Sequence, residues 1–372
     1  MSTWCKGRRL EPRASPAFPM PPAGKFFSRE WFSLKNGCSL RYDGASIPSP
    51  ELTMPVLFLK EADVQQVLTM DMALEAVEMG FKKLGLDEAM NINRQRVVTD
   101  HAVLHTMGAA AKTLGGMGTK VYSTSRKGNA VFLVTLFDGK TGDLICLMQA
   151  DYLGQMRTGA ASGLATRIIS RPDASKLGIF GSGKQAKTQV EAICKVRNIK
   201  RVEVFSPNQG HREQFAKEVS ATCGVEVVPV DTPAEAAKGK DIVCTATKAR
   251  DPFFIPEWLE FGMHVNAVGA NYMGKAELFP EAIRRFDTIV VDSKDQARLE
   301  AGDFQVGLED GSLKWSAVWD LSAVVGGRYQ VREAETGITL FKSVGLAIQD
   351  LAVGMKVYQK ALADGLGQMI DW

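Results

Sequence analysis

Two glycines and an alanine stand at a spacing that suits the binding of a phosphate group. Gly181, Gly183 and Ala186 form the pattern G-x-G-x-x-A directly after the apolar run 177–180. The first glycine permits a tight turn, the second lets a pyrophosphate approach the backbone, and the alanine lets the next helix pack closely. The N–H groups at that helix's N-terminus then face the anion. This strand–turn–helix context predicts a dinucleotide site. Its contacts are expected from Gly181, Ser182, Gly183, Lys184, Gln185 and Ala186.

The end of the following strand indicates which dinucleotide is bound. Sites for NAD usually place Asp or Glu there, where it binds the ribose hydroxyls. Here the expected strand 202–205 has its acidic residue, Glu203, inside the strand and not at its end. Ser206 and Asn208 follow the strand, and the cation Arg212 lies just beyond them. We therefore expect Ser206, Asn208 and Arg212 to contact the cofactor, and NADPH to be favoured over NADH.

Two later strand ends extend the same site. Thr245 and Ala246 close the expected strand 242–246, and Val268 and Gly269 follow at the end of the next one. Ligands of open α/β sheets bind outside the carboxyl ends of the strands. These four residues are therefore expected to contact the cofactor.

Two cations in the first half of the chain could bind a carboxylate. Arg96 lies 24 residues before Lys120, and both fall in strand-like segments. A guanidinium binds a carboxylate through two parallel hydrogen bonds, and a lysine buried among strands can have a lowered pKa and exchange protons. Taken alone, both residues are better explained as ordinary surface cations of strands. Arg94 is a competing candidate, because it lies two residues away on the same strand face.

The expected elements divide the chain into two kinds of structure. Segments 93–147 alternate apolar and polar residues between turn signals, which predicts an antiparallel meander. Helices are expected over 71–84 and 151–169, and a C-terminal helix carries one apolar stripe. After residue 176, strands and helices alternate, which predicts a parallel sheet with right-handed crossovers. The stripe consists of Val344, Ile348, Leu351, Met355 and Tyr358.

Composition excludes several classes of protein. The 372 residues include 45 Lys and Arg against 42 Asp and Glu, a net charge of +3, which gives no electrostatic reason to expect nucleic acid as a partner. No apolar run approaches the ~18 residues of a membrane span. The six cysteines form no C-x-x-C pair and have no histidine at ligand spacing. We therefore expect no metal site and a reducing compartment, the cytoplasm.

The first 53 residues differ from the rest of the chain. They hold seven of its 15 prolines and an excess of basic residues, without helical or strand periodicity. We interpret residues 1–53 as a disordered extension. An organelle-targeting peptide is a weaker alternative, because acidic residues interrupt the basic bias.

From about Met54 to Leu362 the chain resembles the ornithine cyclodeaminase/mu-crystallin family. The resemblance implies a Rossmann NAD(P)-binding domain plus a split α+β dimerisation and substrate domain. We assign 173–324 to the first, and 54–172 with 325–372 to the second. The motifs that carry the resemblance are 118–120 (GTK), 157–160 (RTGA), the 181–186 loop, 262–269 (GMHVNAVG), 291–293 (VDS) and 341–345 (FKSVG).

The resemblance also assigns roles to single residues. It implies that Arg96 and Lys120 hold the α-carboxylate of a small substrate, and that Lys120 also touches the reacting atom. It places Arg157 beside both the cofactor pyrophosphate and this carboxylate, with Thr158 next to it. Lys342 and Ser343 open the expected C-terminal helix and, by resemblance, reach the nicotinamide side of the site.

One departure from the family pattern bears on the reaction. Cyclodeaminases and archaeal-type alanine dehydrogenases carry Asp where this chain has Asn271, and an amide cannot accept a proton near neutral pH. We therefore expect an NAD(P)H-dependent reductase that interconverts a small, cyclic α-imino acid and its L-α-amino acid, with Lys120 as the proton donor and Asn271 beside the reacting atoms. The alternatives are ornithine cyclodeaminase proper, which converts L-ornithine to L-proline and ammonia with bound NAD, and a non-catalytic, crystallin-like binding protein.

The apolar helices suggest an assembly. The C-terminal stripe and the small-residue helix 160–168 offer more apolar surface than one small mixed domain usually needs, and its antiparallel sheet leaves a face uncovered. Such surface normally marks an interface, and two-fold dimers are the commonest solution. We expect a homodimer through the non-Rossmann domain. The alternative is that both helices bury their apolar residues within one monomer.

Overall fold

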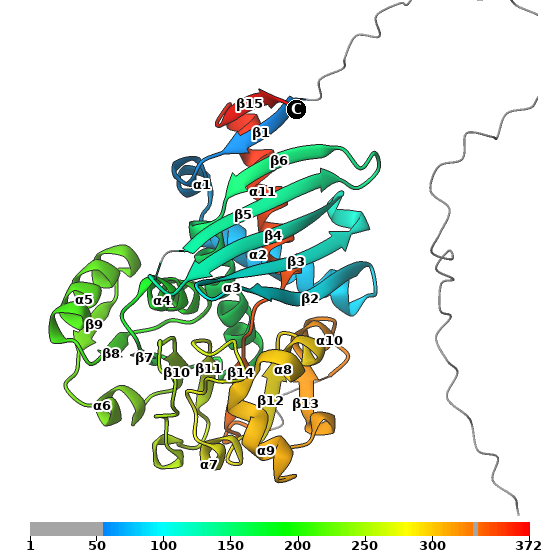
Figure 1. Cartoon of the computed structure of the whole chain (residues 1–372). Coiled ribbons are helices and arrows are strands. Elements are labelled where there is room, and N and C mark those ends of the chain that lie inside the picture. The colour runs from blue at the N-terminus through cyan, green and yellow to red at the C-terminus, as the bar shows by residue number, and fades with distance from the viewer. Residues whose placement is uncertain (1–54, 129, 330–333) are drawn as a thin grey trace, which may run out of the picture. The chain divides into compact units, whose positions relative to one another are not determined.

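Two sheets organise the chain, which we describe from a computed structural model (Figure 1). The structure describes residues 55–372 apart from 129 and 330–333, so the extension expected over 1–53 lies outside the described residues. One sheet is mainly antiparallel and the other is parallel. Among the described residues, none of the helices has the length and hydropathy needed to cross a membrane.

The antiparallel sheet is the meander that the alternating residues predict. Its strand order is β15-β1-β6-β5-β4-β3-β2, and only the β1–β6 pair is parallel. The strands are β1 (Pro55–Leu59), β2 (Ala89–Val98), β3 (Ala102–Ala111), β4 (Gly116–Ser125), β5 (Ala130–Asp138), β6 (Leu144–Gln149) and β15 (Gln368–Asp371). Both ends of the described chain therefore meet at one edge of this sheet.

Helices cover one face of the antiparallel sheet. Helix α11 (Ala347–Asp364) crosses β2 to β5 and packs on α2 (Met70–Gly85) and α3 (Asp151–Ile169), while α1 (Glu61–Val67) lies against α11 and α3. Figure 1 shows α2 and α11 behind the strands. Helix α3 is buried almost all round, because its small residues let α2, α4 and α11 approach it closely.

The parallel sheet has the order β13-β12-β14-β11-β10-β7-β8-β9. Strand β7 leads outward to β8 and β9, whereas β10 returns to its other side, which is the switch point of a Rossmann fold. The strands are β7 (Lys176–Phe180), β8 (Arg201–Phe205), β9 (Glu226–Pro229), β10 (Ile242–Thr245), β11 (His264–Ala267), β12 (Thr288–Val291), β13 (Val318–Asp320) and β14 (Thr339–Lys342). The helices are α4 (Lys184–Val196), α5 (Gln209–Cys223), α6 (Pro233–Ala237), α7 (Pro280–Ile283), α8 (Lys294–Glu300), α9 (Gln305–Glu309) and α10 (Leu321–Val325).

One strand corrects the expected course of the chain. Segment β14 lies inside the parallel sheet, between β11 and β12. The sequence interpretation instead placed Lys342 and Ser343 at the start of the C-terminal helix and ended the parallel part at residue 324. Lys342 ends a strand, Ser343 stands in the following loop, and α11 begins only at Ala347.

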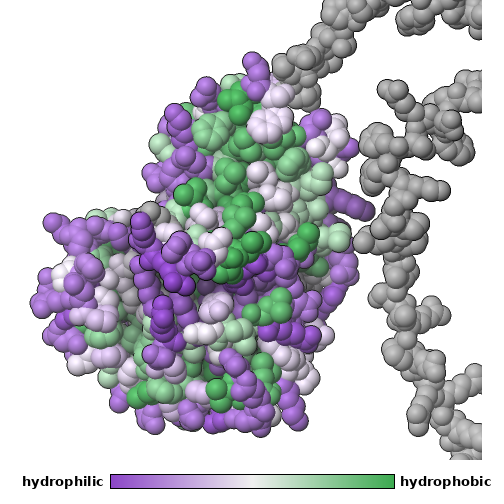
Figure 2. Space-filling view, in the orientation of Figure 1, coloured by the Kyte–Doolittle hydropathy of each residue, from purple (hydrophilic) through white to green (hydrophobic). Residues whose placement is uncertain are grey.

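Exposed large apolar side chains gather on one face of the antiparallel sheet. Ile348, Leu351 and Met355 of α11 are buried within the described chain, as are the small residues of α3, although Leu362 near the end of α11 is 44% exposed. The strand face opposite these helices bears exposed large apolar side chains. They are Met90, Ile92, Val97, Leu104, Met117 and Val131. Figure 2 shows hydrophobic residues gathered over this sheet.

Helices α3 and α4 connect the two sheets through a close backbone approach that we can test. A Cβ added at Gly159 would lie 2.4 Å from the Thr188 carbonyl oxygen of α4. Gly159→Ala should therefore force the helices apart and lower the free energy of unfolding by about 1–3 kcal/mol. A urea titration followed by circular dichroism measures this change.

Gly210→Ala is the matched control, because Gly210 is an exposed glycine of α5 whose added Cβ would meet nothing closer than 3.6 Å. That variant should be as stable as the parent chain or slightly more stable. Equal stability of the Gly159→Ala variant and the parent would contradict the close packing of α3 and α4.

Candidate active site

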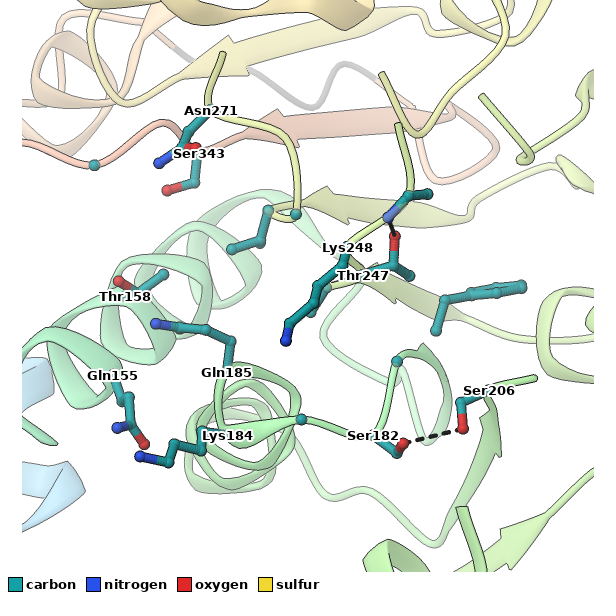
Figure 3. Close-up of a pocket in the computed structure, with 18 of the residues that line it drawn as sticks. Gln155, Thr158, Ser182, Lys184, Gln185, Ser206, Thr247, Lys248, Asn271 and Ser343 are labelled. Atoms are coloured by element: carbon teal, nitrogen blue, oxygen red, sulfur yellow. Dashed lines mark hydrogen bonds between the residues drawn. The ribbon is translucent and has the colours of Figure 1, made fainter. Parts of the chain in front are cut away.

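A cavity of about 1130 Å³ runs along the carboxyl ends of β7, β8, β10 and β11 and reaches α3 and strands β2, β4 and β5. Residues of both sheets line it. Figure 3 shows polar side chains from α3, α4 and the strand ends around this space. Its position at the switch point of the parallel sheet is where such folds bind ligands.

The glycine-rich loop forms one wall of the cavity. Gly181 has a φ of +103°, and an added Cβ would lie 2.4 Å from the Ala246 carbonyl oxygen. A Cβ added at Gly183, the N-cap of α4, would meet no atom of the described residues within 4 Å. Open space therefore lies beside the first N–H groups of α4, which have no acceptor within the helix. Ala186 is fully buried behind the loop and does not line the cavity.

The side chains of this loop suit a polar, anionic ligand. Ser182, Lys184 and Gln185 line the cavity with the glycines, and Thr158 lies across from them on α3 (Figure 3). The buried Gln185 Oε1 atom has no hydrogen-bond partner among the described residues. A bound dinucleotide would meet a free acceptor, open backbone N–H groups and a lysine here, so these residues fit the group that the sequence predicts.

The end of β8 agrees only in part with the sequence interpretation. Ser206 and Asn208 line the cavity, and the Ser182 hydroxyl donates to the Ser206 hydroxyl at 3.0 Å. Arg212 does not line it. Its buried guanidinium donates to the Ser206 carbonyl oxygen at 3.2 Å and pairs with Asp231. In this structure Arg212 holds the strand end, and its expected contact with the cofactor stays a prediction.

The ends of β10 and β11 are held by a carboxylate that sequence reasoning missed. Ala246, Val268 and Gly269 line the cavity, but Thr245 is buried and donates to Glu277 Oε2 at 2.7 Å. The same carboxylate accepts from the Gly269 N–H at 2.8 Å. Burial raises the pKa of Glu277. Thr245 thus supports the wall from behind, and its expected contact with the cofactor stays a prediction.

Lys342 is another correction. It is fully buried, forms an ion pair with Asp303 at 2.7 Å and donates to the Ala270 carbonyl oxygen at 2.6 Å. It does not line the cavity, whereas the next residue, Ser343, does. Lys248, which sequence reasoning missed, also lines the cavity, and Figure 3 shows its ammonium group projecting into it.

Three charged residues meet at the deep end of the cavity. Lys120 Nζ lies 2.7 Å from Asp350 Oδ1, and Arg157 Nε lies 3.2 Å from the same oxygen. Lys120 is 3% exposed and Asp350 is 1% exposed. Lys120 and Arg157 both line the cavity, as expected. Asp350 was missed, because the sequence shows it only as one acidic residue near the start of a helix.

Burial sets the proton affinity of the lysine. Burial lowers the pKa of Lys120 to about 8, and the positive charge of Arg157 acts in the same direction. The negative charge of Asp350 opposes this shift, because it raises the pKa. The ammonium nitrogen also lies 5.6 Å from the centre of the Phe132 ring and 6.0 Å from that of Tyr122. Lys120 can therefore give up a proton near neutral pH, which an exposed lysine does poorly.

Arg94, the competing candidate, faces the cavity in place of Arg96. The strand register shifts between Ile92 and Gln95. Arg94 is buried, lines the cavity, pairs with Glu300 and donates to the Val344 carbonyl oxygen at 3.0 Å. Arg96 does not line the cavity, and its expected contact with the substrate stays a prediction.

Arg96 instead supports the rim of the site. It lies 2.5 Å from Glu300 and donates to the carbonyl oxygen of Asn271, which does line the cavity. Burial lowers the pKa of His105 to about 4, and the positive charges of Arg96 and Arg94 contribute to this shift. This histidine is therefore neutral. The described residues hold no group of three or more side chains that could ligate a metal.

The comparison with known proteins decides the family. The pattern of the ornithine cyclodeaminase/mu-crystallin family matches residues 55–365. The chain belongs to this family. It is 31% identical over 326 residues to a Delta(1)-pyrroline-2-carboxylate reductase of Bacillus cereus. The matched region covers 85% of this chain and 100% of the relative.

Solved structures of this family are similar throughout the described part. The Delta(1)-pyrroline-2-carboxylate reductase of Thermococcus litoralis, in complex with NADH and L-proline, has a TM-score of 0.81 and 33% identity, covering 85% of this chain and all of that one. An archaeal alanine dehydrogenase dimer with bound NAD has a TM-score of 0.79 and 32% identity, covering 86% and 100%. The two-part α/β architecture is therefore that of the ornithine cyclodeaminase/mu-crystallin family.

The glycine loop yields a prediction that separates binding from folding. Gly183→Val adds a side chain into open space at an extended backbone position, so the unfolding midpoint should stay unchanged. The same side chain blocks the approach of a pyrophosphate, so the Kd for NADPH and NADH should rise at least tenfold, on the order of the loss of one charged hydrogen bond. Fluorescence titration with each nucleotide measures it.

Gly181→Ala is the contrasting variant, because its positive φ and the nearby Ala246 carbonyl disfavour any side chain. It should lower the unfolding midpoint as well as the affinity. Unchanged nucleotide affinity of Gly183→Val would contradict the assignment of the loop.

Proposed function

We propose that this protein is an NAD(P)H-dependent reductase that interconverts a small, cyclic α-imino acid and its L-α-amino acid. The observation that carries the proposal is the buried lysine at the deep end of a dinucleotide-sized cavity, flanked by Arg94 and Arg157. The names of its relatives, which include Delta(1)-pyrroline-2-carboxylate reductase, support the same class of reaction. In the proposed substrate site, Arg94 takes the place that the sequence assigned to Arg96, while Lys120 and Arg157 are unchanged.

Different residues of the cavity have different roles in the reduction. Arg94 and Arg157 bind the substrate carboxylate, since a guanidinium matches its two oxygens. Phe132 and Tyr122 line the same end and exclude water. A dinucleotide held by the glycine loop would supply the hydride for Cα from its nicotinamide ring and would leave as NAD(P)⁺. Lys120 gives one proton to the imine nitrogen, so that the C=N bond becomes a CH–NH bond and a neutral lysine remains.

Asn271 favours reduction over cyclodeamination. It lines the cavity, and its amide cannot take a proton from a substrate amine near neutral pH. Loss of ammonia from ornithine needs such an acceptor, whereas imine reduction needs only a donor, which Lys120 provides. We therefore place ornithine cyclodeaminase second.

We propose NADPH as the preferred cofactor. The cavity at the end of β8 is lined by Ser206, Pro207, Asn208 and His211, with no carboxylate to bind a free ribose diol. Glu203 points elsewhere, to Arg201 and Lys240.

Steady-state reduction of Delta(1)-pyrroline-2-carboxylate tests the proposed reaction. Turnover should be highest below pH 8 and fall as the pH rises through about 8, because the donor form of Lys120 is lost. Lys120→Met should lower kcat by about 100- to 10,000-fold, the usual contribution of a general acid. The KM should be lower for NADPH than for NADH.

Lys195→Met is the control, since Lys195 pairs with Asp71 on the surface and should leave kcat unchanged. Ammonia release from L-ornithine with catalytic NAD⁺, without oxidation of NAD(P)H by any cyclic imine, would overturn the proposal.

We propose a homodimer through the outer face of the antiparallel sheet. Cross-strand neighbours share a face, so Val97, Leu104 and Val131 form one exposed apolar row, and Met90 and Met117 belong to another. Contiguous apolar surface of this kind usually marks an interface. The alanine dehydrogenase relative is a dimer, which agrees with this assembly.

Light scattering of Ile92→Asp tests the dimer. Ile92 is 62% exposed on this face, so a charge there should not disturb the monomer but should prevent pairing. The parent chain should have twice the 40.5 kDa chain mass and the variant one chain mass. Phe261→Asp, at a residue 84% exposed outside the sheet, should remain a dimer. A monomeric parent chain at micromolar concentration would contradict the proposal.

A further inference from the structure

Asp350 lies in the first turn of α11 but points into the protein. Its Oδ1 atom accepts from Lys120 Nζ at 2.7 Å and lies 3.2 Å from Arg157 Nε. Its neighbour Gln349 accepts from Arg157 at 2.6 Å through its side-chain oxygen. One helical turn therefore contacts Lys120 and Arg157, two of the three cations that line this end of the cavity.

The second oxygen of Asp350 is not satisfied. Oδ2 is buried and has no hydrogen-bond partner within the described part of the chain. An unpaired buried carboxylate oxygen costs free energy, and groups held at such a cost are concentrated at functional sites. The neighbours of Asp350 on α11, Ile348 and Leu351, belong to the hydrophobic core, so Asp350 stands out as a buried acidic residue on this helix.

The helix dipole alone does not account for this geometry. An acidic residue in the first turn of a helix favours the positive end of the helix dipole. Asp71 does this in α2, where it is exposed and pairs with the surface residue Lys195. The dipole explains neither the burial of Asp350 nor its contact with Lys120, a residue 230 positions away in the chain.

We propose that Asp350 is the positioning residue of the proton donor. It keeps the Lys120 ammonium group charged where the cavity is closed to water, and it fixes this group beside Arg157. The site has an amide, and no carboxylate, at position 271. This inference rests on the proposed imine reduction. Asp350 touches neither substrate nor cofactor in it. The proton passes from Lys120 Nζ to the imine nitrogen, and Lys120 regains a proton from water between turnovers.

The charges around Lys120 set the expected direction of the effect. Asp350 faces it from α11, Arg157 from α3 and Arg94 from β2, and Tyr122 on its own strand is kept neutral because burial raises its pKa. Among these groups Asp350 is the one whose charge favours the ammonium form. Without it, burial and two arginines act together, and the pKa of Lys120 falls below about 8.

Asp350→Asn tests the inference by two measurements. The pH above which kcat for Delta(1)-pyrroline-2-carboxylate declines should fall by at least one unit, which is a tenfold change in the protonated fraction of Lys120 at a given pH. NMR of lysine labelled with ¹³C at Cε, assigned with Lys120→Arg, should show the same fall in the titration of Lys120 without any substrate. Asp350→Glu keeps the charge and should restore most of the parent pH profile at a lower kcat.

Asp71→Asn is the matched control and should leave both measurements unchanged, because it removes a first-turn acid outside the cavity. An unchanged Lys120 titration in folded Asp350→Asn would overturn the inference even if the parent reduces imines. If Asp350→Asn does not fold, a shifted titration in Asp350→Glu would contradict it. A parent chain that reduces no imine but shows the shift would overturn the proposed function and leave the positioning role of Asp350 supported.

Discussion

The buried charge of Lys120 is the constraint on which the rest of the structure depends. An ammonium group removed from water stays charged only with a partner of opposite charge at hydrogen-bond distance. Lys120 comes from β4, Asp350 from α11 and Arg157 from α3, so the sheet and both helices must hold a fixed relation to keep the 2.7 Å contact. Close packing of small residues along α3 provides that relation.

The same constraint connects the cofactor half to the substrate half. After β14 the chain passes through Ser343–Gly345, which lines the cavity, and enters α11, which carries Asp350. Asp292 of the parallel sheet fixes this passage by accepting from the Val344 N–H at 2.9 Å and the Gly345 N–H at 2.6 Å. One short segment thus links the parallel sheet to the helix that carries Asp350.

Local patterns in the sequence predict the glycine loop, the meander and the helix that carries Arg157, because each depends on neighbours within a few residues. Lys120 is singled out only by the resemblance to the family. Long-range contacts are not visible in this way. The register shift that turns Arg94 inward follows from strand pairing. Lys342 lies in a four-residue strand buried among others, too short for a periodic signal. Asp350 looks like any first-turn acid until Lys120 is brought beside it.

The transfer of hydrogen to a bound imine measures the chemistry of this site most directly. Delta(1)-pyrroline-2-carboxylate is incubated with the protein and NADPH that carries deuterium at both C4 positions, and the product is analysed by mass spectrometry. If the lysine and the two arginines hold the imine against the nicotinamide, each molecule of proline carries one deuterium, located on Cα. Proline without deuterium, or NADPH that stays reduced while the imine is bound, would contradict hydride transfer at this site.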